Sequence, residues 1–374
     1  MKHCDVLVVG GGPAGSSLAW GLRNSGLDVL IIDRKTFPRD KVCAGWITPA
    51  VIETLQIDTE DYCQKHVFEP IRGFRIGVIG GDAIEIPYNG KPVSYGIRRY
   101  EFDNYLLGRT SATFRPGMAF KNMLRDGQTW IVNNEIRTPL VIGAGGHFCP
   151  VARCIGAGIE HAENPVVAQE MEFRLTRRQS SACELRPDMP ELYFCNDFRG
   201  YGWLFRKGDY LNIGLGREDP DNLPGHTNAF CDFLRHRGKI PRNLPGKFNG
   251  HAYHLYHHCQ RPLFTDGVLL IGDAAGLACS QSGEGIRPAV ESGIMAANII
   301  HNTRGNYDRD SLEPYHESIR QRFGERKGNG AITAFMPAWI KHYLAGRLLA
   351  TRWFTRSVLM NHWFLHSNQK TLSL

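Results

Sequence analysis

The stretch DVLVVGGGPAGSSLA, residues 5–19, runs from an apolar strand pattern through three glycines into a helical pattern. We expect a strand at 5–9, a helix at 13–25 and a second strand at 29–32, because the apolar residues first form a short run and then recur with helical spacing. A glycine-rich turn between a strand and a helix is typical of a nucleotide-binding βαβ unit. The stretch therefore predicts an α/β fold that opens with such a unit.

Glycines and one acid in this unit indicate what it binds. Gly10 permits the tight turn, Gly12 lets the backbone approach a pyrophosphate, and Gly15 lets the helix pack closely on the strand. The pyrophosphate would lie at the helix N-terminus, and Asp33 would accept hydrogen bonds from ribose hydroxyls, which disfavours a 2′-phosphate. The unit thus suits FAD or NAD rather than NADP. The flanking residues of the predicted cofactor set are Pro13, Ala14 and Arg34.

Composition excludes several classes of protein. The 374 residues are 42% hydrophobic and 22% charged, as in a globular protein of two or three structural units, and not as in a disordered chain. No apolar run reaches the roughly 18 residues of a membrane span. Ten cysteines without a CxxC motif indicate free thiols. We expect a cytoplasmic protein.

A second glycine loop follows a late apolar strand. The segment VLLIGDAAG covers 268–276, and CSQSGEG covers 279–285 before a long helix at 285–300. Asp273 could hold a polyol chain by hydrogen bonds, and the helix N-terminus near Gly285 could stabilise an anionic reduced flavin by about 1 kcal/mol. Without further support, the segment also fits an ordinary buried strand and turn.

The middle of the chain has a different pattern. Residues 166–175 and 210–215 alternate polar and apolar side chains, as in a half-solvated antiparallel sheet. The sequence predicts a hairpin at 74–86. Because nucleotide-domain patterns return after residue 260, we expect a discontinuous nucleotide domain with a sheet domain inserted, and helices at the end of the chain.

Several segments resemble the FAD-dependent oxidoreductases of the p-hydroxybenzoate hydroxylase fold, and within them the geranylgeranyl reductase family. The resemblance covers residues 1–329 in the expected order. Its segments are GGGPAGSSLA with Asp33, FPRDKVCAGW at 37–46, RRYEFDNYLL at 98–107, GYGWLFRKGDYLNIGLG at 200–216, and GDAAG with SGEGIRPAVESG within 272–293. The substrate-domain segment at 200–216 is the most specific to the reductases.

The resemblance implies a domain organisation. It predicts a Rossmann-like FAD-binding domain, an inserted antiparallel-sheet substrate domain and C-terminal helices. The expected limits are 1–72 with 94–160 and 260–305 for the first, 73–93 with 161–259 for the second, and 306–374 for the third.

The resemblance also implies FAD and its contacts. Asp273 would contact the ribityl chain, and Arg99 and Asp103 occupy the marked positions of the family's Arg-x-x-x-Asp helix. The further cofactor residues that it implies are Cys43, Ala44, Gly45, Gly272, Gly283, Gly285 and Ile286.

Three residues are the predicted catalytic set: Cys43, Tyr201 and Trp203. A thiol beside a flavin could donate a proton to a carbon that has received a hydride, or contact the substrate; a small buried hydrophobe is the alternative interpretation of Cys43. Tyr201, Trp203 and Phe205 share one face of a strand and could wall an apolar substrate tunnel, or simply form sheet core. Glu284 is either an acid–base group or a helix cap.

A histidine-rich segment does not predict a metal. His251, His254, His257 and His258 with Cys259 match no closed zinc spacing, and a strand would point them in both directions. We therefore predict no metal site.

The resemblance implies reduction of carbon–carbon double bonds in an isoprenoid or other lipid-like substrate. The electron donor stays open between NAD(P)H, ferredoxin and quinol. A flavin monooxygenase or halogenase acting on an apolar or aromatic metabolite is a second hypothesis on the same fold. A non-catalytic flavin-binding accessory protein is a third, because Gly145 stands where the family usually has an acid. Arg206 likewise replaces the proline of the substrate motif.

Charge is concentrated at the end of the chain. Residues 301–374 hold 11 Lys and Arg against 5 Asp and Glu, whereas the rest holds 33 against 32. The segment 331–374 contains no acid, and Pro337, Trp339, Tyr343 and Leu348 predict a basic amphipathic helix. Such a helix could bind the inner face of a membrane or cap the substrate pocket. No nucleic-acid motif accompanies it.

Overall fold

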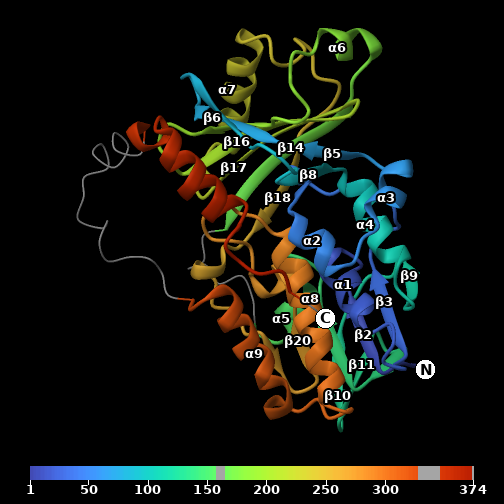
Figure 1. The fold of residues 1–374 in the computed structure, drawn as a ribbon. Coiled ribbons are helices and arrows are strands. Elements are labelled where there is room, and N and C mark those ends of the chain that lie inside the picture. Colours follow the sequence, from blue (N-terminus) through green and yellow to red (C-terminus); the bar gives the residue numbers. More distant parts are fainter. Residues whose placement is uncertain (157–164, 327–345, 373–374) are drawn as a thin grey trace.

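The computed structural model describes residues 1–156, 165–326 and 346–372. In Figure 1 a parallel sheet with its covering helices lies in the lower half, and a large, mainly antiparallel sheet crosses the upper half. The described architecture is the predicted α/β combination of a Rossmann-like part and a substrate-sheet part.

The nucleotide-binding sheet has six strands in the order β19-β20-β13-β2-β3-β9. Its members pair in parallel except for β19, which runs antiparallel to β20. Every residue of β2 is buried, as expected for a strand covered on both faces. The strands are β2 (Val6–Val9), β3 (Val29–Asp33), β9 (Thr113–Pro116), β13 (Leu140–Gly143), β19 (Phe264–Thr265) and β20 (Val268–Leu270).

Two smaller sheets flank this one. A four-stranded sheet has the order β1-β12-β11-β10, and a three-stranded sheet has the order β4-β8-β5. The first comprises β1 (Lys2–His3), β10 (Met123–Asp126), β11 (Thr129–Val132) and β12 (Ile136–Thr138). The second comprises β4 (Trp46–Ile47), β5 (Phe68–Ile71) and β8 (Ser94–Ile97).

The large sheet has seven strands in the order β18-β14-β17-β16-β15-β6-β7. Only the pair β15 and β6 is parallel among its described ladders. The expected hairpin is β6 (Gly73–Val78) with β7 (Ala83–Pro87), and the remaining strands are β14 (Val166–Arg174), β15 (Glu191–Phe194), β16 (Gly200–Lys207), β17 (Tyr210–Arg217) and β18 (Asn249–Tyr253).

The expectation of a half-solvated sheet is wrong for the centre of this sheet. Seven of the eight residues of β17 are buried, and separate apolar clusters pack on its two faces. One cluster includes Trp203, Phe205 and Phe364, and the other includes Leu204 and Phe230. Polar residues such as Asn212 are therefore buried in hydrogen-bonded networks rather than solvated.

The helices cover the two parts of the molecule. The long α8 (Ile286–Asn302) packs on α1 (Pro13–Gly21) beside the parallel sheet, and α7 (Leu223–His236) covers the far side of the large sheet (Figure 1). The other α-helices are α2 (Pro49–Thr54), α3 (Thr59–Lys65), α4 (Arg99–Gly108), α5 (Pro150–Cys154), α6 (Arg177–Ala182) and α9 (Arg309–Phe323). Short 3₁₀ turns are η1 (Tyr256–His258) and η2 (Gly272–Ala275), and η3 (Phe354–Phe364) is a π-helix.

Glycine sets the distance between α1 and α8. A Cβ on Gly293 would lie 2.5 Å from the Ala14 carbonyl oxygen, and one on Gly21 would lie 2.7 Å from Ala297 Cβ. Both contacts are too short for a side chain, so the two helices pack backbone to backbone. This packing fixes where the N-terminus of α8 meets the N-terminus of α1.

The C-terminal segment η3 lies against the large sheet (Figure 1). The predicted helix around Pro337, Trp339 and Tyr343 lies outside the described residues. Within the described part of the chain, no helix is both long and apolar enough to span a membrane. The ten cysteines all lie in that part, and none of them forms a disulfide there.

Candidate functional site

One cavity lies between the parallel sheet and the large sheet. It is bordered by the N-termini of α1 and α8, by the loop that follows β3, and by β14, β16 and β18 of the large sheet. Residues predicted for FAD and residues predicted for substrate therefore face the same space. The predicted site residues among its lining are Gly10, Gly12, Pro13, Ala14, Asp33, Arg34, Cys43, Ala44, Arg99, Tyr201, Trp203, Asp273, Gly283, Gly285 and Ile286.

Four predicted residues do not line it. Gly15 and Gly272 support the turns: a Cβ on Gly15 would overlap the Gly10 carbonyl, and one on Gly272 would lie 3.0 Å from Ala14 Cβ. Gly45 has a positive φ of 67°, and its N–H lies 3.3 Å from Cys43 Sγ. Phe205 lies behind the wall, with its ring centroid 5.9 Å from that of Trp46.

The turn before α1 is built to admit a bulky anion. Gly10 has a φ of 119°, and a Cβ on it would overlap the Ala144 carbonyl oxygen, so only glycine fits there. The Asp33 carboxylate accepts a 2.9 Å hydrogen bond from the Gly11 N–H, which ties the end of β3 to this turn. Arg39 lies beside Gly12, and its buried Nη1 has no hydrogen-bond partner among the described residues. This cradle fits the pyrophosphate of a dinucleotide such as FAD.

Lys41, His251 and Asp273 form a second polar group in the cavity wall. Lys41 Nζ lies 2.8 Å from His251 Nε2, which in turn lies 3.8 Å from Asp273 Oδ2. Burial lowers the pKa of Lys41 to about 8, while hydrogen bonding from His251 and the nearby Lys41 charge lower the pKa of Asp273 against the opposing effect of its burial. An ionised Asp273 can accept hydrogen bonds from the hydroxyls of a ribityl chain.

Arg99 is anchored beside Cys43. Its guanidinium donates to both carboxylate oxygens of Asp103, at 2.7 and 2.8 Å, from one turn earlier on α4. Arg39 makes a 3.1 Å ion pair with the same fully buried carboxylate. Burial opposes the charge of Arg99, but Asp103 outweighs it and raises the Arg99 pKa. The predicted cationic position is thereby held rigidly at the edge of the cavity.

Aromatic rings form the wall opposite the cradle. Tyr201 and Trp203 extend from β16, Trp46 comes from β4, and Phe364 comes from the end of η3. The Phe364 ring lies 5.7 Å from that of Trp46 and 5.5 Å from that of Tyr201. The sequence offered capping of the pocket by the aromatic residues of the C-terminal segment as one of two alternatives, and Phe364 does line the cavity.

A buried network fixes this wall to the Cys43 loop. Trp203 Nε1 donates to Asn212 Oδ1 at 2.8 Å, and Asn212 Nδ2 donates to the Cys43 carbonyl at 3.1 Å. Lys207 donates 3.0 Å bonds to the carbonyls of Ala44 and Ile97, and it pairs with a glutamate of β14. The positions of Trp203 and Cys43 are therefore coupled.

The histidine-rich segment is divided by the structure. His251 faces the cavity, whereas the His254 ring packs 4.4 Å from that of His147 within the nucleotide-binding part. Cys259 is buried against Gly276. These residues are therefore not drawn together as one ligand set.

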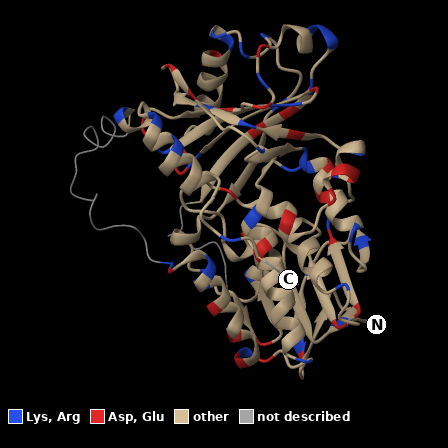
Figure 2. Cartoon of the chain, in the orientation of Figure 1, with Lys and Arg blue, Asp and Glu red and all other residues tan. Residues whose placement is uncertain are grey.

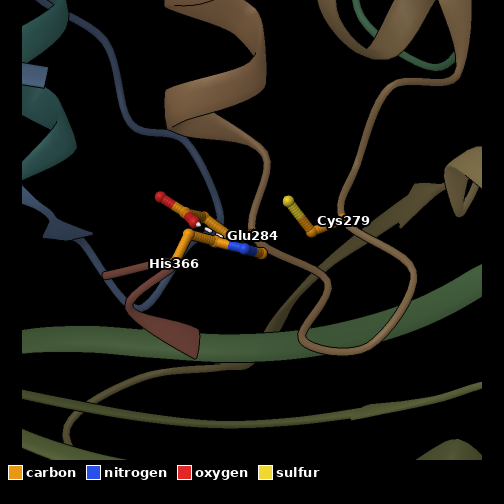
Figure 3. A group of neighbouring side chains, drawn as sticks. All are labelled: Cys279, Glu284 and His366. Atoms are coloured by element: carbon orange, nitrogen blue, oxygen red, sulfur yellow. Dashed lines mark ion pairs between the residues drawn. The ribbon is translucent and has the colours of Figure 1, made fainter. Parts of the chain in front are cut away.

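Glu284 belongs to a group that joins two distant segments (Figure 3). Its carboxylate lines the cavity just before α8, and His366 Nε2, from the chain after η3, lies 3.6 Å from Glu284 Oε2. Cys279 completes the group: its Sγ, a carboxylate oxygen of Glu284 and a ring nitrogen of His366 all lie within 4.8 Å of one another. Burial raises the pKa of Glu284 to about 8 and lowers that of His366 to about 4.

Comparison with known proteins identifies the family. A family model described as an FAD binding domain matches residues 3–58. A menaquinone reductase of Mycobacterium tuberculosis is 30% identical over 347 residues, which cover 86% of this chain and 80% of that protein. A digeranylgeranylglycerophospholipid reductase of Methanocaldococcus jannaschii is 26% identical, with 86% of each chain covered.

A solved structure shares the fold. The geranylgeranyl bacteriochlorophyll reductase-like protein of Thermoplasma acidophilum superposes with a TM-score of 0.75 at 22% identity, over 94% of this chain and 88% of that chain. The predicted fold and FAD are confirmed by these comparisons together with the cradle before α1. The chain therefore belongs to the geranylgeranyl reductase family of FAD-dependent oxidoreductases.

Proposed function

We propose that this FAD-dependent oxidoreductase reduces carbon–carbon double bonds of an isoprenoid or other lipid-like substrate. The observation that carries the proposal is the shared cavity, in which Trp46, Tyr201, Trp203 and Phe364 face the anion cradle of α1. An apolar chain would gain from burial against such rings, at roughly 25 cal/mol per Å² of apolar surface. Names of relatives, which refer to a digeranylgeranyl lipid and to menaquinone, point to the same substrate class.

FAD, when bound and reduced, would supply the hydride from its N5 atom. We assign the pyrophosphate to Gly12 and Arg39, and the ribityl chain to Asp273, because these groups line one continuous wall. Arg99 would hold the edge of the cofactor beside Cys43.

The protein residues position the substrate and exclude water. Tyr201 donates a 2.6 Å hydrogen bond to the Ser282 carbonyl, so its ring is fixed across the cavity between β16 and the loop before α8. Trp203 is fixed by Asn212, and Cys43 by the same residue. We assign Cys43, Tyr201 and Trp203 to contact with the double bond that reacts, and Phe205 to support of Trp46 from behind.

The electron donor is one of three classes: a nicotinamide, a ferredoxin or a quinol. Reduction of the bound flavin by each donor in turn, followed by absorbance in an anaerobic cell, distinguishes them. The same cell tests the reaction class. Reduced protein that is reoxidised by a polyprenyl lipid without oxygen supports the reductase, whereas a strict need for oxygen would establish a monooxygenase or halogenase instead.

A membrane surface is the proposed source of the substrate. The described part of the C-terminal segment exposes Trp353 (69%) and Leu348 (44%) beside Arg352 and Arg356. Figure 2 shows basic residues along this segment. An exposed indole and an exposed leucine that are flanked by arginines suit the interface of an anionic bilayer.

A further inference from the structure

We propose that Glu284 is the acid that delivers the proton in double-bond reduction, and that His366 is the residue that positions it. This inference rests on the proposed function. The sequence suggested the Cys43 thiol as the proton donor, and the structure-based proposal gives that role to the Glu284 carboxyl.

Geometry places the Glu284 carboxyl between the cavity and the C-terminal segment. Glu284 lines the cavity beside Tyr201 and Phe364. A tight loop presents it, since the Gly283 N–H donates to the Cys279 carbonyl and the Cys279 N–H donates to the Glu284 carbonyl, both at 2.8 Å. Glu284 therefore has a fixed backbone at the cavity wall, and its carboxyl oxygens are buried beneath that wall.

The Glu284 carboxyl has no side-chain hydrogen-bond partner among the described residues, although the Arg287 backbone N–H at the start of α8 favours its anion, and His366 Nε2 faces it at 3.6 Å (Figure 3). Burial of the carboxyl makes the anion costly and outweighs that backbone contact, so the neutral acid is the favoured form. Catalytic hydrogen bonds are often long before substrate binds and shorten in the complex. A neutral His366 can accept the hydrogen of that acid and hold it toward the cavity.

The charges around Glu284 come from three segments. Arg287 on α8 favours the anion, but its Nε is committed to Glu291 at 2.7 Å, and Arg322 of α9 also pairs with Glu291. Burial and Glu291 favour the neutral acid and together outweigh Arg287, which leaves the Glu284 pKa raised. Cys279 faces Glu284 from the side of the loop.

Competing proton donors are less suited. The Tyr201 hydroxyl already donates its hydrogen bond to the Ser282 carbonyl, and burial raises the pKa of this hydroxyl. Burial also raises the pKa of the Tyr253 hydroxyl well above its usual range. Lys41 also lines the cavity with a pKa of about 8, but its Nζ is engaged by His251 at 2.8 Å. Glu284 combines a protonated resting form with a pKa of about 8, which suits an acid catalyst.

The reaction balances as follows in bonds and electrons. One alkene carbon receives the hydride that reduced FAD supplies, and the flavin is oxidised by two electrons. The other carbon uses the π electron pair to bond the Glu284 proton, so one O–H bond breaks and one C–H bond forms. The resulting carboxylate regains a proton from solvent, and His366 again holds the neutral acid.

The test uses the purified holoprotein, reduced with dithionite under nitrogen and mixed in detergent with a digeranylgeranyl glycerophospholipid, which has no quinone ring to accept the electrons. Reoxidation of the flavin is followed by absorbance. We expect Glu284→Gln to slow reoxidation by about 10²- to 10⁴-fold, the usual contribution of a positioned acid. Glu284→Asp should recover part of the rate, and the control Glu60→Gln, at an exposed glutamate of α3 outside the cavity lining, should react as the wild type does.

The pH profile tests His366. The wild-type rate should be highest below the Glu284 pKa of about 8 and fall as pH rises through it. His366→Ala should move this fall to lower pH, because the acceptor that stabilises the neutral acid is lost, whereas His366→Gln, which keeps an acceptor, should restore it.

Thermal unfolding gives a readout that does not depend on turnover. A folded-state pKa of about 8, raised from the ordinary value of 4.5, means that the native protein binds the proton more tightly than the unfolded chain. Stability therefore falls as pH rises through this window. The difference in Tm between Glu284→Gln and the wild type should grow between pH 5 and pH 8 and then level off.

The outcomes separate the two proposals. A wild type that does not reduce the lipid overturns the proposed function and the proton donor with it. A wild type that turns over while Glu284→Gln keeps its rate and pH profile overturns only the Glu284 assignment. A stoichiometric metal in the purified protein, lost together with activity in Cys279→Ser, would also overturn it in favour of a metal site.

Discussion

Trp203 shows how one residue ties the substrate wall to the cofactor side. Its indole N–H donates to Asn212, which reaches the Cys43 carbonyl across the boundary between the two sheets. The ring is 93% buried, so the hydrogen bond has no water to replace it. A buried acceptor that loses its donor costs about 1–3 kcal/mol.

Trp203→Phe should therefore destabilise the protein by about 1–3 kcal/mol and lower the rate of flavin reoxidation by lipid. The matched control is Trp353→Phe, because that indole is 69% exposed and should lose little stability. Urea unfolding and anaerobic stopped-flow absorbance provide the two measurements. Equal stability of the two variants would show that the Trp203 network does not hold the wall.

At the scale of single residues, the sequence predicted the residues of the cofactor side better than it predicted the residues that the C-terminal segment brings to the cavity. Gly10, Asp33, Arg99 and Asp273 were predicted for the cofactor side from motifs, and all four line the cavity. Phe364 was only offered as one of several C-terminal aromatic residues that could cap the pocket, and His366 was not predicted for the site. Their place depends on tertiary packing, which no local periodicity records.

Helices α1 and α8 pack as a pair, and their N-termini lie at the two ends of the predicted cofactor site. The N-terminus of α1 carries the glycine cradle, and the N-terminus of α8 follows Glu284 and Gly285. Their close packing through Gly293 leaves no room for a methyl group.

Gly293→Ala should force the helices apart and cost about 1–3 kcal/mol, as overpacking of a core does, while weakening FAD binding. Gly108→Ala is the control, because a Cβ at this position on α4 meets nothing within 4 Å. That variant should be neutral or stabilised by about 0.4–1 kcal/mol. Fluorescence of released FAD during a thermal ramp measures both properties, and identical curves for the two variants would refute the packing argument.

Element boundaries were predicted closely where the pattern was strong. The helix expected at 285–300 is α8, and the hairpin expected at 74–86 is β6 with β7. The helix expected at 13–25 ends already at Gly21, because a turn follows it before β3. The large sheet was mispredicted as half-solvated, since alternation in one strand does not reveal that η3 and α7 cover both faces.

At the scale of the whole molecule, the net positive charge belongs to residues 301–374, which hold 11 Lys and Arg against 5 Asp and Glu. Figure 2 shows basic residues along the described C-terminal segment, where Trp353 and Leu348 are exposed. The rest of the chain is nearly neutral, with 33 basic against 32 acidic residues before position 301. The same segment supplies Phe364 to the cavity wall. The segment thus lines the cavity through Phe364, while Trp353 and Leu348 are exposed, so a membrane contact stays a prediction that the capping of the pocket does not exclude.

Anionic liposomes should bind the holoprotein weakly, and salt should abolish binding because the attraction is electrostatic. Trp353→Ser combined with Arg352→Glu should reduce cosedimentation of the protein with the liposomes. Arg304→Glu is the control, because Arg304 follows α8 and lies outside the C-terminal segment, and it should leave cosedimentation unchanged. Cosedimentation that is unchanged in the double variant would show that this segment does not form the membrane contact.

The most direct test of the central claim is identification of the product. Reduced holoprotein is incubated without oxygen with an equal amount of a digeranylgeranyl glycerophospholipid, which has no quinone ring, and the lipid is extracted for mass spectrometry. The proposed function predicts a lipid that has gained two hydrogens at a carbon–carbon double bond for each flavin oxidised. A lipid recovered unchanged, with flavin that stays reduced until oxygen is admitted, would contradict it.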